Sequence, residues 1–106
     1  MPKFLIEASY TTEGLKGLQK DKASGRLAAV TQAAQSLGGN LESMHFALGV
    51  DDVVVILDLP DAGAAAALGT AVSGSGLVRT RTTALLTVAE MDQALTRSAA
   101  YRGPGQ

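Results

Sequence analysis

Residues Val53 to Leu59 read Val-Val-Val-Ile-Leu-Asp-Leu, and this stretch decides the fold. β-Branched residues favour extended backbone, so we predict a strand over residues 53–59. Side chains alternate between the two faces of a strand, and here both alternating sets are mostly apolar. An antiparallel sheet with one face in water carries polar residues at every second position, which this strand does not. The stretch therefore predicts a central strand with both faces covered.

Periodicity on either side of this strand predicts the remaining elements. Apolar alternation predicts further strands over 3–10, 40–48 and 77–86, and apolar residues at three- and four-residue steps predict helices over 24–37, 60–73 and 87–97. The pair Gly38-Gly39 ends the first helix, and Thr87 with Glu90 forms a capping box at the start of the last. Because Gly14 and Gly17 disfavour a helix, residues 12–22 are predicted as a short helical turn and a polar connection.

The order βαββαβ with a terminal helix predicts an α+β fold, the ferredoxin-like plait. Two helices should cover one face of a four-stranded antiparallel sheet whose first and third strands are central. Residues 1–97 should form the single domain, with residues 98–106 as a flexible C-terminal tail.

Composition restricts the function. The 106 residues carry a net charge of −1, which gives no general attraction to nucleic acid or to an anionic membrane. The absence of cysteine excludes disulfides, zinc–thiolate sites and cysteine nucleophiles. No stretch suits a membrane span or a signal peptide, so we expect a cytoplasmic protein without a cofactor or a metal ion.

The apolar second face of the sheet predicts a partner. Covering it with the same face of another copy would form a homodimer with twofold symmetry. The residues predicted on this open face are Leu5, Glu7, Ser9, Ser43, His45, Val54, Ile56, Asp58, Arg79 and Arg81. Since covered charges need partners, Glu7 or Asp58 should pair with Arg79 or Arg81.

Several residues of this face are candidates for chemistry. His45 with Glu7 or Asp58 would form an acid–base group, because histidine titrates near neutral pH and carboxylates in apolar surroundings have a raised pKa. The structural alternatives are a half-exposed strand histidine and simple salt bridges. No ligand spacing typical of a metal site accompanies these residues, so metal binding is not predicted.

Other residues are candidates for ligand binding. Arg79 and Arg81 point to the same face and could hold a carboxylate or a phosphate, or else form cross-strand ion pairs. Tyr10 and Ser43 are the other candidate ligand contacts. The turn Gly49, Asp51 and Asp52 is explained by aspartate binding to nearby backbone amides.

The chain resembles the GYD family of small bacterial proteins over about residues 2 to 95. The family signature, Gly-x-Tyr-Asp followed by valines, corresponds to Gly49-Val50-Asp51-Asp52-Val53-Val54. Supporting matches are Thr12-Glu13-Gly14-Leu15, Ser24 with Arg26, Leu37-Gly38-Gly39, Pro60-Asp61 and Val78-Arg79-Thr80. The signature tyrosine is Asp51 here, so a role of that phenol does not transfer.

The resemblance implies a fold of the dimeric α/β-barrel group, in which two plaits pack sheet against sheet. That group includes cofactor-independent monooxygenases, haem-handling enzymes, isomerases and effector-sensing domains, so the fold alone does not select a reaction. Our first hypothesis is a homodimeric, non-catalytic or regulatory module that binds a small organic molecule. The alternatives are a cofactor-independent monooxygenase- or isomerase-like enzyme that uses His45 with Glu7 or Asp58, and a structural oligomer module without a ligand.

Overall fold

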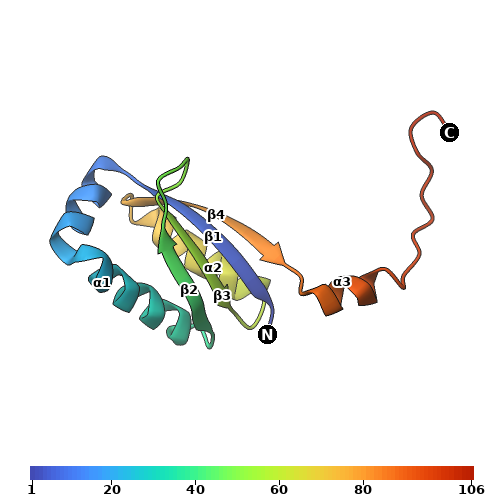
Figure 1. Cartoon of the computed structure of the whole chain (residues 1–106), viewed down its shortest axis with the longest axis horizontal. Coiled ribbons are helices and arrows are strands. Elements are labelled where there is room, and N and C mark those ends of the chain that lie inside the picture. Colours follow the sequence, from blue (N-terminus) through green and yellow to red (C-terminus); the bar gives the residue numbers. More distant parts are fainter.

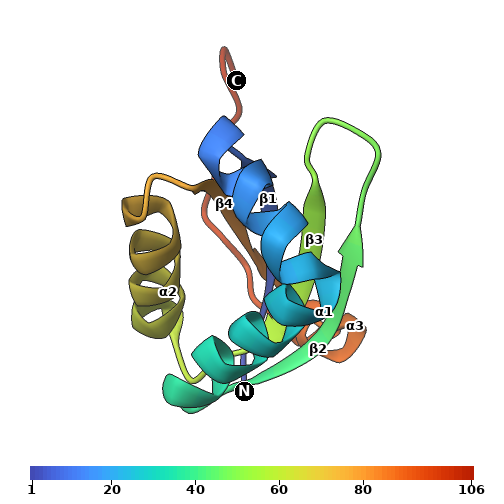
Figure 2. The same cartoon turned by 90° about the vertical axis from the view of Figure 1, so that its left-hand side faces the viewer.

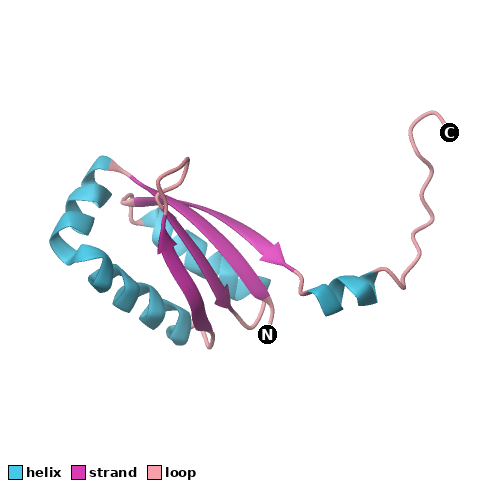
Figure 3. Cartoon of the chain, viewed as in Figure 1, coloured by secondary structure: helices cyan, strands magenta, loops and turns pink.

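A computed structural model describes residues 1–106 as one sheet with two helices against it and a third helix apart from it (Figures 1 and 3). The elements are β1 (Lys3–Tyr10), α1 (Thr12–Ser36), β2 (Asn40–Phe46), β3 (Val53–Asp58), α2 (Ala62–Gly74), β4 (Val78–Leu85) and α3 (Val88–Ala94). The sheet is antiparallel with strand order β2-β3-β1-β4. The predicted α+β plait with β1 and β3 in the centre is confirmed.

Helices α1 and α2 lie on the same face of the sheet (Figure 2). The side chains of β1 and β3 that point toward them are buried and apolar, including Phe4, Ile6, Val55 and Leu57. Residues Ala34 of α1 and Leu68 of α2 complete this core from the helix side. All 11 buried residues of the cluster are apolar, so the hydrophobic effect is the main force that holds the two layers together.

Helix α1 begins twelve residues before its predicted start, at Thr12, so the predicted polar connection over residues 12–22 is wrong. Thr11 caps the helix, because its hydroxyl accepts a hydrogen bond of 3.2 Å from the Gly14 N–H. At Gly14 a Cβ atom would lie 1.9 Å from the carbonyl oxygen of Leu77. Glycine is therefore required there by close contact with the chain before β4, and it does not mark a break in the helix.

A kink divides α1 at Lys22, whose φ of 66° and ψ of 169° lie outside the helical region. The second half of the helix ends as the sequence predicts. Gly38 has a φ of 80°, which favours glycine, and the Gly39 N–H donates to the Ala34 carbonyl at 2.9 Å. The Gly38-Gly39 stop is confirmed.

The caps of the other two helices are also present. Asp61 accepts a hydrogen bond of 2.8 Å from the Ala64 N–H at the start of α2. At α3 the Thr87 hydroxyl accepts from the Glu90 N–H, and the Glu90 carboxylate accepts from the Thr87 N–H, which confirms the capping box. Nevertheless, α3 has no buried residue and extends away from the sheet beyond the end of β4 (Figure 1). No helix of the chain combines the length and hydropathy needed to cross a lipid bilayer.

Strand β2 differs from its prediction in two ways. It ends at Phe46, so Leu48 lies fully exposed in the loop that precedes β3 instead of beside Met44. Its register with β3 shifts between Leu41 and Ser43, which leaves Glu42 as an extra residue in a β-bulge. The bulge places both Leu41 and Met44 against the core.

Candidate functional site

The face of the sheet that no helix covers, called here the open face, carries the residues that the sequence assigns to it. In the register of the sheet, Glu7 lies beside Arg81 of β4 and Val54 of β3, and Val54 lies beside His45 of β2. The next row toward the other end of the sheet contains Leu5 and Ile56, both half-buried. The open face therefore has an apolar centre.

A charged cluster lies at the end of the open face near the β2–β3 loop. The carboxylate of Asp51 forms an ion pair with the guanidinium of Arg81 and accepts a hydrogen bond of 3.0 Å from the Ser9 hydroxyl. Arg81 also lies 3.5 Å from the carboxylate of Glu7, so the predicted pairing of Glu7 with an arginine is confirmed. The guanidinium of Arg81 holds the pKa of Asp51 below its ordinary value, and Asp51 in turn raises the pKa of Arg81.

A second charged cluster lies at the opposite end of the open face. The ammonium of Lys3 bonds to the carboxylate of Asp58 at 2.9 Å and also to the carboxylate of Glu42. The Asn40 side chain donates a further hydrogen bond of 3.3 Å to Asp58. The hydrogen bond from Lys3 lowers the pKa of Asp58, and the carboxylates of Glu42 and Asp58 raise the pKa of Lys3. Asp58 thus pairs with Lys3, and the predicted pairing with Arg79 or Arg81 does not form.

The three candidate catalytic residues occupy separate places. Asp58 lies opposite Lys3, and Glu7 is four residues further along β1, which is about 13 Å at the rise of an extended strand. His45 is exposed, and Val54 lies between it and Glu7 in the same row. Within one chain the structure does not bring a carboxylate into contact with the imidazole.

The remaining predicted site residues divide between the two faces. Ser43 lies beside Ile56 on the open face, and Arg79 lies beside Ser9. Tyr10 instead faces the helices. The Asp52 carboxylate accepts a hydrogen bond of 2.9 Å from the Tyr10 N–H of β1, so it ties the loop to the sheet and does not bind the nearby turn amides as predicted. Asp51 forms its ion pair with Arg81 of β4, which is 30 residues away in the sequence, so its role is not confined to the turn as predicted.

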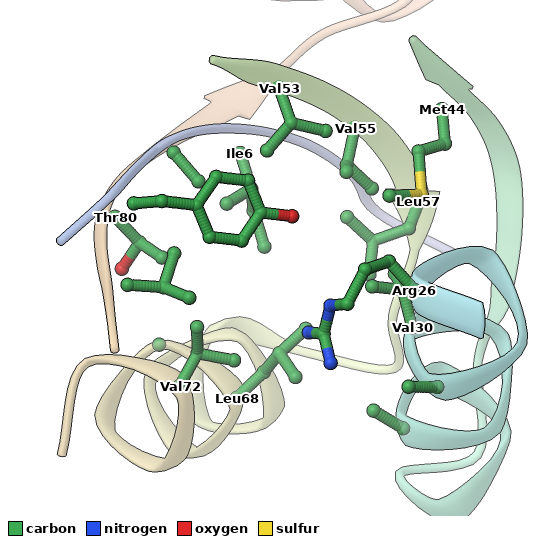
Figure 4. Close-up of a pocket in the computed structure, with 16 residues that line it drawn as sticks. Ile6, Arg26, Val30, Met44, Val53, Val55, Leu57, Leu68, Val72 and Thr80 are labelled. Atoms are coloured by element: carbon green, nitrogen blue, oxygen red, sulfur yellow. The ribbon is translucent and has the colours of Figure 1, made fainter. Parts of the chain in front are cut away.

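An apolar cavity of about 90 Å³ lies between the covered face of the sheet and the two helices (Figure 4). Of its 16 lining residues, 13 are hydrophobic, among them Ile6, Val30, Val55 and Leu68. Tyr10 is the only aromatic residue of the lining. A second, more polar cavity of about 230 Å³ adjoins the first, and the two share Tyr10, Arg26, Val72 and Val78.

Arg26 is the one charged residue that lines the apolar cavity, and Figure 4 shows its side chain extending from α1 into that space. Its Nε atom is buried without a hydrogen-bond partner, and no ion pair of the chain involves it. Leu27, the next residue and one of the apolar residues at three- and four-residue steps, is instead 46% exposed. Arg26 precedes Val30 by four residues and Ala33 by seven, so helical spacing was the signal that could have revealed its inward position.

Comparison with protein-family models gives a match over most of the chain. The family model of the GYD domain matches residues 4–95, which is most of the chain. No curated protein and no solved structure matches the chain.

Proposed function

The chain belongs to the GYD family, and we propose that it is a homodimeric module that binds a small organic molecule in the cavity beneath α1 and α2. The observation that carries the proposal is the cavity itself, with one half-buried arginine, Arg26, in its lining. Ligand sites are typically concave and mostly apolar, with a few polar groups that orient the ligand. The lining described above has this character.

The dimer is supported by the apolar centre of the open face. Leu5, Val54 and Ile56 lie side by side there, and neither α1 nor α2 reaches them (Figure 2). The two charged clusters lie at the ends of this apolar centre, in the manner of the polar rim of a protein interface. We propose that the open face of a second copy covers these residues.

The shape of the chain also supports a partner. A compact monomer of this mass would expose about 5,500 Å² and have a radius of gyration of about 13 Å. The chain exposes 7197 Å² and has a radius of gyration of 16.7 Å. The excess area is about as large as a standard interface buries from both partners together. Helix α3 and the residues after it extend away from the sheet (Figure 1), and Val88 of α3 and Leu95 directly after it are more than two-thirds exposed. We therefore propose that α3 also packs against the second copy.

Sedimentation velocity tests the dimer. We expect a dimer at micromolar concentration for the natural protein and a monomer for Ile56→Lys, which places a charge in the centre of the open face. Val50→Lys is the control, because Val50 is 93% exposed in the β2–β3 loop and should leave the dimer intact. A natural protein that sediments as a monomer at tens of micromolar would refute the dimer.

Thermal stabilisation by small organic molecules tests the binding function. The screen should include aliphatic and aromatic acids, alcohols and amides, flavin and haem. Ala33→Leu, which fills the cavity, should abolish the stabilisation, and Ala28→Leu on the exposed side of α1 should retain it. If no compound stabilises the natural protein, the structural alternative without a ligand is favoured.

The enzyme alternative stays a prediction that rests on His45, Glu7 and Asp58. In the proposed dimer these residues face the second copy, together with Ser43 and Arg79, so groups from two chains could meet there. Any turnover found with a compound from the screen should then be lost in His45→Ala and Glu7→Gln. Unchanged turnover in both variants would rule out this mechanism.

A further inference from the structure

Resting on the proposed function, we propose that the ligand is a small apolar carboxylate. Arg26 binds its carboxylate group, and its hydrocarbon part fills the apolar cavity beneath α1 and α2. The inference specifies the ligand class, and it depends on the surroundings of one guanidinium group.

The first argument is the missing partner of Arg26. A buried polar group without a hydrogen bond costs folding free energy, and a charged one costs more. The Nε atom of Arg26 is such a group, and no carboxylate lies within ion-pair distance of the side chain. Other cations without an ion pair, such as Arg79 and Lys22, are exposed to water, whereas Arg26 is half-buried. A ligand that supplies a carboxylate would satisfy it.

The second argument is the chemistry of the rest of the lining. The Thr80 hydroxyl is already hydrogen-bonded to the Ser73 hydroxyl at 2.9 Å. Tyr10 offers one further hydroxyl, and 13 of the 16 lining residues are hydrophobic. A ligand that fits must therefore present one anionic group and an otherwise apolar surface. A phosphate would bring more charge than a single guanidinium offsets, which favours a monocarboxylate.

The third argument is the position of Arg26 at the boundary of the two cavities. It lines both the apolar cavity and the larger polar one. A carboxylate at this boundary stays in contact with the polar side while its hydrocarbon tail points inward. The inner volume of about 90 Å³ is below the roughly 150 Å³ of a cavity that accepts benzene, so a flexible unbranched chain that can follow the shape of the space should fit better than a rigid ring.

Asp21 also lines the polar cavity and is the acidic residue of that lining. It forms no ion pair with Arg26, so the guanidinium remains available. Its negative charge near the entrance should weaken the binding of an anion. Asp21→Asn should accordingly strengthen carboxylate binding about twofold to threefold.

The test compares three ligands of equal length: hexanoate, hexanamide and 1-hexanol. Calorimetric titration of the full-length protein should show that hexanoate binds at least about tenfold more tightly than the two neutral compounds. Equal affinity for all three would overturn the inference and leave the proposed function intact, because the cavity would still bind a small molecule. Failure of all three, together with every other compound of the thermal screen, would instead refute the proposed function.

Variants then assign the preference to Arg26. Arg26→Gln should remove the advantage of hexanoate over hexanamide while keeping the affinity for 1-hexanol within about twofold, because the apolar lining is unchanged. Arg26→Lys keeps the charge but loses the bidentate geometry, so it should retain part of the preference. Arg97→Gln, which removes an exposed arginine beyond α3, is the control and should behave as the natural protein. A full preference for hexanoate in Arg26→Gln would contradict the inference even if that variant were less stable.

Discussion

The two faces of the same sheet differ in how their polar groups are satisfied. On the covered face, apolar side chains pack beneath α1 and α2 around a cavity, and the one charged group there, Arg26, lacks a partner. On the open face, two charged clusters are internally paired around an apolar centre that no element of the chain covers. The covered face has a packed apolar core and one charged residue without a partner, whereas the open face has two paired charged clusters and an apolar centre that nothing in the chain covers. Each face lacks what a different molecule would supply: a small anion on one side and a second copy on the other.

The largest expected effect comes from comparing two neighbouring residues of β3 that point to opposite faces of the sheet. Leu57 is fully buried, and Leu57→Ala should lower the free energy of unfolding by about 2–5 kcal/mol through the cavity that it leaves. Ile56→Ala changes the open face and should destabilise mainly the dimer, so its effect should depend on protein concentration. Urea unfolding at low and high protein concentration measures both. If Ile56→Ala lowers the free energy of unfolding equally at low and high protein concentration, the open face does not differ from the covered face in needing a second copy.

The next effect concerns how closely α1 approaches the sheet. Gly14→Ala should destabilise by about 1–3 kcal/mol, because the new methyl group would collide with the Leu77 carbonyl oxygen. Gly17 has open space around it, so Gly17→Ala should stabilise by about 0.5–1 kcal/mol through helix propensity. Chemical unfolding of both variants gives the comparison. Equal effects would show that the contact at Gly14 is not a constraint.

The third prediction removes the unsatisfied charge of the covered face. Arg26→Met keeps the side-chain volume and removes the buried orphan nitrogen, so it should raise the free energy of unfolding by about 1–2 kcal/mol in the absence of ligand. The same variant should lose the additional stabilisation that hexanoate gives. If Arg26→Met is clearly less stable than the natural protein without ligand, the guanidinium has a partner within the protein in solution. Measuring Arg26→Met in the Asp21→Asn background would then show whether Asp21 is that partner.

A smaller effect is expected at α3. Thr87→Ala removes the reciprocal cap, which should cost about 1 kcal/mol. In one chain α3 buries nothing, so this cost appears in global unfolding only if a second copy covers the helix. We expect it in the unfolding of the dimer at fixed protein concentration. An unchanged midpoint, with faster amide exchange over residues 88–94, would place α3 outside the interface.

The smallest effect is a pH dependence of the open face. Arg81 holds the pKa of Asp51 below its ordinary value of 3.8, so the carboxylate stabilises the fold above that pH. The contribution is lost as the pH falls through the lower folded-state pKa. Asp51→Asn should therefore be less stable than the natural protein at neutral pH, and the difference should shrink on acidification below about pH 4.

The control for the pH dependence is Asp92→Asn. Asp92 lies exposed on α3, and its replacement should give a curve parallel to that of the natural protein. A difference between Asp51→Asn and the natural protein that is constant down to pH 2 would contradict the role of the Arg81 pair.

Much of the fold could be predicted from the sequence because local signals agree with the tertiary structure. The apolar strand at 53–58 and the caps at Asp61 and Thr87 are read directly from residue types and spacing. The first half of α1 could not be predicted, because the residue that seemed to break it, Gly14, is required by a contact 63 positions away in the chain.

The candidate site was harder to predict for the same reason. The pairing of Asp51 with Arg81 depends on how the β2–β3 loop meets β4, and local rules explained Asp51 as a turn residue. The cavity of Arg26 depends on the positions of two helices that are distant in sequence. Residue spacing fixed which face each strand residue occupies, but it did not show which charges would meet.

The β-bulge at Glu42 lets two core residues of β2 lie three positions apart in the sequence, which a regular strand does not allow. A strict alternation would send Leu41 and Met44 to opposite sides, since three positions separate them. The extra residue restores both to the core and leaves Ser43 and His45 on the side that awaits a second copy. Deleting Glu42 would leave Leu41 and Met44 two positions apart, so both would still face the core in a regular strand, and the ion pair of Glu42 with Lys3 would be lost. The bulge thus lets the strand carry one additional carboxylate at the rim of the open face without turning any core residue outward.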